Sequence, residues 1–228
     1  MNKKVLLAVF AALLVLAITV PVFAVDDALI AAAKEEGTLV SYGLPDSWAN
    51  YGGIWKIYQE LYGIERMDTD MGSGEIIQSL RAEAGAPVAD ITDLGLNYAK
   101  VVEDDNLSQP YKHSYWDELP DYAKSGEGLW SAGFWGAVAI TVNKDLVKNV
   151  PTSFADLTSE EYYDSICIRD PRESATGIMA VMAMAFANGG SEQDPEPGIE
   201  FFGQLQKSGN LRYIKPNLSN IQKGECPI

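Results

Sequence analysis

The sequence predicts an α/β protein of two lobes with mainly parallel sheets, and three observations lead to this fold class. Short β-type runs alternate with helical segments at the spacing of βαβ units, in the first hundred residues and again near the C-terminus. Between the two series, residues 107–128 show weak periodicity and many Tyr, Pro, Asp and Gly. A long β-rich run over 129–143, interrupted by Gly133 and Gly136, then has the length to cross between two lobes.

The first series opens with a helix over 28–36, because Asp27 can cap its start and Gly37 can end it. Strands and helices then alternate, each helix being closed by glycine or proline. The remaining elements are a strand over 38–42, a helix over 48–62, a strand over 64–68, a helix over 76–84 and a strand over 88–95.

The second series contains an unusually apolar helix over 175–188. Apolar residues occur on nearly all of its sides, so we expect it to be buried on most of them. Its methionines are expected to fill the core. The other elements of this series are a strand over 166–168, a helix over 197–207, a strand over 211–214 and a short helix over 218–222.

The N-terminus has the pattern of a secretory signal over residues 1–24. Lys3 and Lys4 precede an apolar run, and Val22-Phe23-Ala24 offers small residues at a cleavage site. A single membrane anchor is the alternative, although the run is short for a span. With residues 1–24 removed, we expect the rest of the chain to form lobe I over 25–135 and a partial lobe II over 136–228.

The net charge indicates which classes of partner the chain can bind, and the cysteines raise the question of a disulfide. The formal net charge of −15 argues against nucleic acid and anionic membranes as partners, and mildly favours a cationic ligand. Cys167 and Cys226 are the two cysteines. Export would permit a disulfide between them, but the apolar neighbours of Cys167 favour two buried free thiols.

Motifs for catalysis or for cofactors are not found in the sequence, which indicates a protein that is not an enzyme and has no cofactor. His113 is the only histidine, so a metal cluster of several histidines is excluded. A secreted hydrolase using Ser174 with His113 remains an alternative from a different class.

Three junctions from strand to helix carry the candidate binding residues: "GLPDSW" over 43–48, "DMGSGE" over 70–75 and "PRESATG" over 171–177. In a parallel sheet such junctions meet where ligands bind, and helix starts offer unpaired N–H donors. Their serines can also simply cap their own helices. Tyr42 and Trp48 flank the first junction, and Trp135 could form the wall of a cleft.

Longer stretches of the chain resemble the periplasmic solute-binding proteins of ABC importers, in the branch that covers ferric iron, polyamine and phosphonate-type binders. The resemblance rests on "LIAAAKEEGTLVSYG", "IIQSLRAEAGAPVADI", "AITVNKDLVKNVPTSFADL", "RDPRESATGIMAVMAMAFANGG" and "NLSNIQKGECPI". It implies a periplasmic-binding-protein-like fold that closes over a ligand. Family members usually continue well past this length, so the resemblance also implies a fragment with its C-terminal part missing.

The resemblance assigns binding roles to residues of both lobes. Asp93 matches a position that often supplies a carboxylate to cationic or metal ligands. The other first-lobe candidates are Asp46, Ser47, Trp48, Gly72 and Ser73, and the second-lobe candidates are Ser174, Ala175, Thr176 and Gly177. With Tyr42 and Trp135, these residues form the expected ligand clamp, and no metal ligand is assigned.

The resulting prediction is a monomeric, periplasmic receptor that delivers a small polar solute to an ABC permease in the inner membrane. A polyamine or a metal ion or chelate is the favoured ligand, because of the acidic balance, Asp46, Asp93 and the nearby tryptophans. The serine, threonine and glycine at the helix starts leave a phosphonate or another small anion as the competing class.

Overall fold

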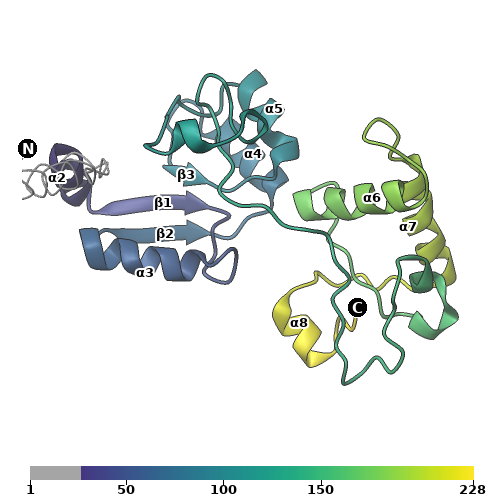
Figure 1. Cartoon of the computed structure of the whole chain (residues 1–228). Coiled ribbons are helices and arrows are strands. Elements are labelled where there is room, and N and C mark those ends of the chain that lie inside the picture. The colour runs from purple at the N-terminus through teal and green to yellow at the C-terminus, as the bar shows by residue number, and fades with distance from the viewer. Residues whose placement is uncertain (1–26) are drawn as a thin grey trace, which may run out of the picture.

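The structure is a computed structural model that describes residues 27–228, so the signal expected over 1–24 lies outside the described residues. The described chain forms two units (Figure 1). We call residues 27–132 the sheet unit, 133–143 the crossing segment and 144–228 the helical unit. The sheet unit contains α2 (Asp27–Glu36), β1 (Thr38–Tyr42), α3 (Tyr51–Tyr62), β2 (Glu65–Thr69), α4 (Ser73–Ala82), β3 (Ile91–Thr92) and α5 (Ala99–Asp104).

A three-stranded parallel sheet organises the sheet unit, with strand order β2-β1-β3. Parallel neighbours require crossover connections, which α3 and α4 provide. Ser41 of β1 is fully buried and donates a 2.7 Å hydrogen bond to the Asp68 carboxylate of β2. The predicted parallel sheet is thus confirmed for this half, although the strand expected over 88–95 is reduced to the two residues of β3.

The helical unit contains α6 (Ala175–Ala187), α7 (Glu196–Ser208) and α8 (Leu218–Lys223). α6 packs on α7 where Gly198 lies so close to α6 that a Cβ there would be 2.1 Å from the Val181 carbonyl oxygen. The buried core of this unit joins α6 and α7 to the segment over 157–166 and to the C-terminal residue. Its members are Leu157, Tyr162, Ile166, Met184, Phe201, Leu205 and Ile228.

The strands predicted for the second half are not formed. Ile166 and Leu211 pair only through an isolated parallel bridge, and no residue over 132–143 is in a strand. The backbone of Ile228 hydrogen-bonds on both sides of Ile166, to Ser165 and Cys167, as a parallel neighbour would. These pairings are one residue long, which is too short to define strands.

The expectation that the helix over 175–188 is buried on most sides is wrong. Within α6 the buried residues are Gly177, Met184 and Ala185, whereas Met179 and Phe186 are exposed. The physical reason is that α7 covers one side of α6, and no sheet of the described chain covers the others.

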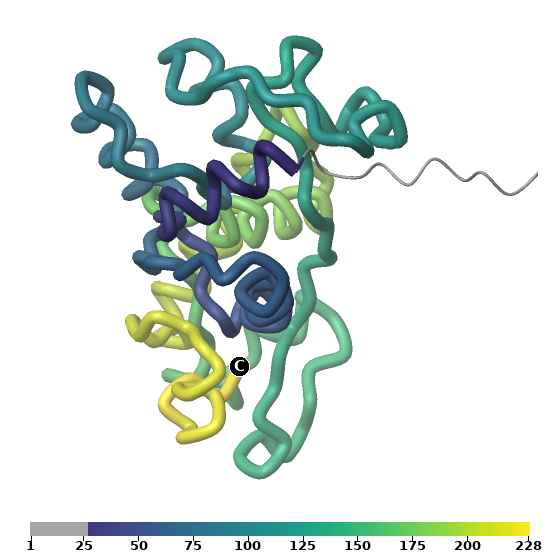
Figure 2. Tube along the Cα trace, turned by 90° about the vertical axis from the view of Figure 1, so that its left-hand side faces the viewer, coloured from purple at the N-terminus to yellow at the C-terminus, as the bar shows by residue number. Residues whose placement is uncertain are grey.

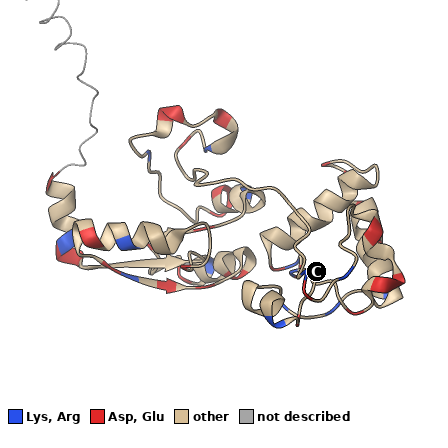
Figure 3. Cartoon of the chain, turned by 60° about the horizontal axis from the view of Figure 1, so that its bottom comes forward, with Lys and Arg blue, Asp and Glu red and all other residues tan. Residues whose placement is uncertain are grey.

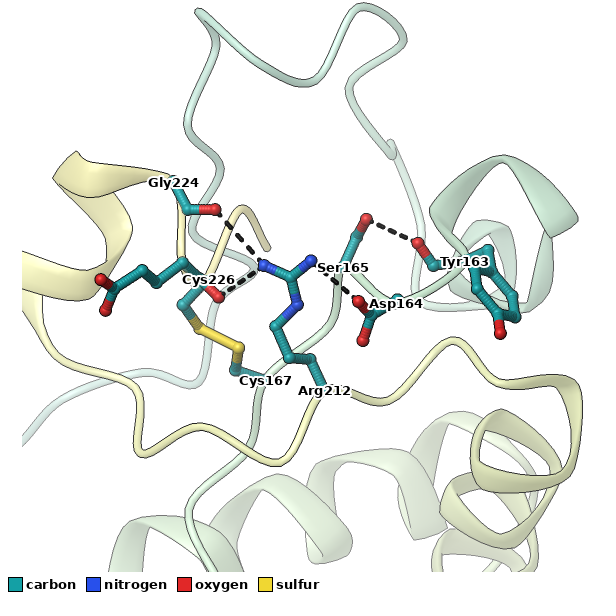
Figure 4. A network of polar contacts seen from close by, with 8 residues as sticks. Tyr163, Asp164, Ser165, Cys167, Arg212, Gly224 and Cys226 are labelled. Atoms are coloured by element: carbon teal, nitrogen blue, oxygen red, sulfur yellow. Dashed lines mark hydrogen bonds and ion pairs between the residues drawn. A yellow bond between two sulfur atoms is a disulfide. The ribbon is translucent and has the colours of Figure 1, made fainter.

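The expectation of two free thiols is also wrong, because Cys167 and Cys226 form a disulfide (Figure 4). The backbone pairing of Ile228 with residues 165 and 167 places the two cysteine Cα atoms 5.8 Å apart, within disulfide range. Arg212 adds polar contacts that hold the same C-terminal segment in place. Its guanidinium donates to the carbonyl oxygen of Glu225 at 2.8 Å and pairs with Asp164 at 2.9 Å.

The crossing segment connects the two units as extended chain without strand pairing, and Figure 2 shows it running down one side of the molecule. Acidic residues occur along both units (Figure 3). Within residues 27–228, no helix has the length and apolar character needed to span a membrane.

Candidate functional site

The strand ends of the sheet unit converge on one edge, where Gly43 follows β1. Gly43 has φ of +79°, and a Cβ on it would lie 2.7 Å from the Ile76 side chain and 3.1 Å from the Asp93 carbonyl oxygen. Its N–H donates to the Thr69 carbonyl at the end of β2. Glycine is therefore required for β1 to turn at this edge beside Asp93.

Asp93 lies at the centre of a cluster with Trp48, Tyr51 and Phe134, which we call the Asp93 cluster. The Trp48 indole Nε1 donates a 3.0 Å hydrogen bond to Asp93 Oδ2, and the Tyr51 hydroxyl also hydrogen-bonds the carboxylate. Phe134 packs edge-on against the rings of Trp48 and Tyr51, with centroid distances of 5.9 and 6.4 Å. Two aromatic residues thus hydrogen-bond the Asp93 carboxylate, and Phe134 packs against both of their rings.

The titration of the Asp93 cluster reflects its partial removal from water. Burial raises the pKa of the Asp93 carboxyl above its ordinary value, while hydrogen bonds from Trp48 and Tyr51 act in the opposite direction. Burial, and then the charge of Asp93, raise the pKa of Tyr51 to about 12. Tyr51 therefore remains a neutral hydrogen-bond donor at any physiological pH.

The start of α4 places Gly72 and Ser73 next to this cluster. The Glu75 carboxylate accepts the Gly72 N–H at 2.7 Å, so the helix start is capped by its own first turn. The buried Ser73 Oγ accepts the N–H of Gly95, two residues after Asp93, at 3.2 Å. Ser73 thereby ties the α4 start to the loop that carries Asp93.

The start of α6 is held by Ser174, which is the N-cap residue and is buried. Its Oγ lies 2.8 Å from the Thr176 Oγ1 within hydrogen-bonding distance. Gly177 fits only because it lacks a side chain, since a Cβ would be 2.4 Å from the Arg169 carbonyl oxygen. These contacts fix the turn over 169–177 against the first turn of α6.

The starts of α4 and α6 meet directly across the two units, and we call this contact the paired helix starts. The Gly74 N–H donates to the Glu173 carbonyl oxygen at 3.1 Å. An added Cβ on Gly95 would lie 2.2 Å from Ala175 Cβ, and one on Gly72 would lie 2.9 Å from the Glu173 oxygen. Candidate residues from the two halves of the sequence are therefore neighbours in space.

Four predicted site residues lie apart from this arrangement. The Tyr42 ring is buried and its hydroxyl donates to Glu83 at 2.9 Å. Asp46 forms an ion pair with Arg66 and, with it, lines a cavity of about 400 Å³ between α3 and the start of β2. Trp135 is 91% exposed. Ser47 is exposed on the turn before α3.

Sequence reasoning missed Tyr51 and Phe134. Tyr51 stands three residues after Trp48, at the spacing that puts two side chains on neighbouring positions of a helical turn. Phe134 precedes Trp135 between the same two glycines. Both signals are present in the sequence, but neither indicates which carboxylate the rings would meet.

The hydrolase alternative finds no support in the contacts of its two residues. Ser174 hydrogen-bonds with Thr176, and the His113 Nδ1 accepts the Tyr115 N–H at 3.2 Å. Within residues 27–228, no group of three or more His, Cys, Asp or Glu side chains is arranged to hold a metal ion.

A parallel sheet whose strand ends face a second unit defines the class of protein as one with an α/β binding-protein fold. Residues 86–227 match the family described as bacterial extracellular solute-binding protein, and the chain belongs to that family. The recognition of this family from the sequence is confirmed, and membership of a solute-binding family agrees with the expectation of a protein that is not an enzyme.

Two curated relatives match over most of this chain. A probable ABC transporter periplasmic-binding protein, y4fP, from Sinorhizobium fredii is 26% identical over 163 residues, which is 69% of this chain and 45% of its own length. An uncharacterized protein from Haemophilus influenzae is 23% identical over 178 residues, or 74% of this chain and 47% of its own. The chain thus spans about half the length of these relatives.

Solved structures confirm the fold class. The periplasmic binding protein AfuA from Actinobacillus pleuropneumoniae, with exogenous fructose 6-phosphate bound, has a TM-score of 0.67 at 23% identity. The match covers 84% of this chain and 62% of that chain. The apo ferric ion-binding protein A from Pasteurella haemolytica has a TM-score of 0.50 at 16% identity, with coverages of 84% and 60%.

Proposed function

We propose that this chain belongs to the exported receptor of an ABC importer, which binds a small polar solute between two lobes and presents it to a permease in the inner membrane. The observation that carries the proposal is the set of paired helix starts beside the Asp93 cluster, where residues from both halves of the chain meet. Ligand contacts from both sides of such a junction stabilise a closed state, and this is how hinge closure is driven.

In this proposal, residues 1–24 are the signal that directs the protein to the periplasm. Lobe I corresponds to 25–135 and lobe II to 136–228, and the receptor acts as a monomer. The proposed binding residues are two members of the Asp93 cluster together with the residues of the two helix starts: Trp48, Asp93, Gly72, Ser73, Ser174, Ala175, Thr176 and Gly177. Tyr42 and Asp46 support the fold through Glu83 and Arg66.

A cationic solute, either a polyamine or a metal ion or chelate, is the favoured ligand. The Asp93 carboxylate receives hydrogen bonds from neutral donors, so its negative charge is not neutralised by them. The negative net charge of the whole chain also favours a cationic ligand. The solved ferric ion-binding protein shows that this fold can serve a metal ligand.

A small anion is the second candidate ligand, and the paired helix starts favour it. Helix N-termini present partial positive charge, and here the starts of two helices are adjacent, joined by the hydrogen bond from the Gly74 N–H to the Glu173 carbonyl oxygen. The solved AfuA structure, which holds a sugar phosphate, has the same fold. The anion class therefore rests on backbone groups, and the cation class on the Asp93 side chain.

Thermal unfolding with a panel of ligands tests the proposal. The full chain, exported with its leader and purified, is heated with putrescine, spermidine, ferric citrate and methylphosphonate. A ligand at a hundred times its Kd adds about 2.7 kcal/mol of stability, which corresponds to roughly 5–11 °C in the unfolding midpoint. If no compound of the panel raises the midpoint, the proposed receptor function is wrong for these solute classes.

A further inference from the structure

The cavity between α3 and the start of β2 is separate from the receptor site proposed above. No residue of the Asp93 cluster or of the paired helix starts lines it. Helix α3 runs beside β2 (Figure 1), and the turn before α3 closes one end of the cavity through Asp46. Its volume of about 400 Å³ lies within the range of roughly 300–1,000 Å³ that is usual for sites of small molecules.

Trp55 brings an unused hydrogen-bond donor to this cavity. The side chain lines the cavity, and its indole Nε1 is buried without a hydrogen-bond partner among the described residues. A buried N–H that is left without an acceptor costs free energy, and nearly all buried polar groups of folded proteins have a partner. The acceptor of the Trp55 N–H is therefore expected to be either water or a ligand.

The charged side chains of the cavity leave one positive charge unpaired. Arg66 donates to the Leu44 carbonyl oxygen and forms an ion pair with Asp46, so the charges of this pair balance. Lys56 also lines the cavity, and it takes part in none of the ion pairs within residues 27–228. Glu65 contributes to the wall, but side chains alternate along a strand, so its carboxylate points to the opposite face from Arg66. The cavity therefore suits a ligand with a single negative charge.

Part of the cavity wall is apolar. Ile64, which is buried, contributes to it, and so do Trp55 and Tyr58, whose rings pack edge-to-face with centroids 5.6 Å apart. The guanidinium carbon of Arg66 lies 5.1 Å from the centroid of the Trp55 ring and covers one side of it. An organic anion with an apolar body can cover the remaining apolar surface, whereas a small inorganic anion cannot.

We propose that the cavity between α3 and β2 is a second binding site, and that its ligand is a small organic carboxylate. The Trp55 indole N–H and the Lys56 ammonium group bind the carboxylate, while Ile64 and Tyr58 contact the apolar part of the ligand. Arg66 is a positioning residue, because its guanidinium packs on the Trp55 ring. A hydrogen bond to an ionised acceptor is roughly twice as strong as one to a neutral acceptor, which favours a carboxylate over water as the partner of the Trp55 N–H.

Saturation-transfer NMR of the full chain, exported with its leader and purified, tests the site with benzoate, benzamide and benzylamine. The three compounds are similar in size and differ in charge, so they separate recognition of a carboxylate from a general affinity for an aromatic ring. We expect benzoate to bind with a Kd in the millimolar range, because a ligand of so few atoms makes few contacts. Benzamide and benzylamine should bind at least about tenfold more weakly, since neither brings an ionised acceptor.

Two variants of the cavity have matched controls. Trp55→Phe keeps a ring and breaks no hydrogen bond of the described chain, and it should weaken benzoate binding about three- to tenfold. Lys56→Met changes an exposed side chain, so it provides a second variant if Trp55→Phe fails to fold, and it should weaken binding about two- to fivefold. The controls are Trp135→Phe, at a residue that is 91% exposed, and Lys34→Met, at an exposed lysine of α2. Both controls should bind benzoate as the unchanged chain does.

Several outcomes would overturn the proposal. Equal binding of the three compounds, or tighter binding of benzylamine than of benzoate, would show that the cavity does not recognise a carboxylate. Unchanged benzoate binding in both Trp55→Phe and Lys56→Met would place the ligand elsewhere on the chain. Absence of benzoate binding at millimolar concentration would leave water as the partner of the Trp55 N–H. None of these results bears on the receptor function, which the ligand panel described above tests separately.

Discussion

The disulfide between Cys167 and Cys226 gives a prediction whose magnitude follows from the structure. The double variant Cys167→Ser/Cys226→Ser removes the bond while nearly keeping the volume of both side chains. The cysteines are 59 residues apart in sequence, and the loop-closure entropy for a loop of that length corresponds to about 4 kcal/mol at 25 °C. We expect the free energy of unfolding to fall by about that amount.

Several parts of the helical unit depend on this one connection. The disulfide holds the segment after α8 against residues 165–167, where Ile228 enters the buried core. Arg212 bonds to the same segment through the Glu225 carbonyl, and this polar contact remains in the double variant. The loss is therefore expected mainly from the greater freedom of the unfolded chain.

Urea unfolding followed by circular dichroism measures the effect, in the presence and absence of a reductant. A loss of about 4 kcal/mol corresponds to a fall of roughly 8–16 °C in the thermal midpoint for a chain of this size. The reductant should destabilise the unchanged chain to the level of the double variant and leave the double variant unaffected. A difference below about 1 kcal/mol between oxidised and reduced chain would refute the reasoning.

Three further predictions concern packing and titration. Gly198→Ala should destabilise the chain by about 1–3 kcal/mol because its Cβ has no room, whereas Gly203→Ala in the same helix, with open space around it, should be neutral or stabilising in urea unfolding. Tyr51 has a pKa of about 12, above its unfolded value of about 10, so its contribution to stability is present below pH 10 and is lost as the pH rises toward 12. Spectrophotometric titration at 295 nm should show one tyrosine fewer ionising near pH 12 in Tyr51→Phe, and an unchanged curve would contradict the assignment. Gly95→Val should separate the two units at Ala175 and increase the radius of gyration in X-ray scattering, and an unchanged radius would exclude the close contact.

The first half of the fold was predictable because its signals are local. The strand over 38–42 has the predicted bounds in β1, and α3 ends at Tyr62 as Gly63 indicates. In the second half, the apolar run over 166–168 predicted a strand. A strand needs a partner over several residues, and here Ile166 pairs at one position only. The number of residues over which a strand pairs depends on distant parts of the chain, and a short apolar run does not indicate it.

The candidate site was predictable where backbone geometry decides it. The turns before α4 and α6 were expected to oppose each other, and Gly74 and Glu173 hydrogen-bond across that junction. Side-chain directions were not predictable to the same degree. Asp46 pairs with Arg66, twenty residues later, instead of joining Asp93, because a single arginine on β2 lies within reach of that turn.

The paired helix starts are joined through main-chain atoms, since the Gly74 N–H meets the Glu173 carbonyl oxygen. A hydrogen bond of this kind does not depend on which side chains the two residues carry. The side chains of the Asp93 cluster, by contrast, make no part of that bond. Substitutions at positions 48, 51 and 134 therefore remove no atom of the bond that joins the two units, so the junction can be kept while the side chains of the Asp93 cluster are varied.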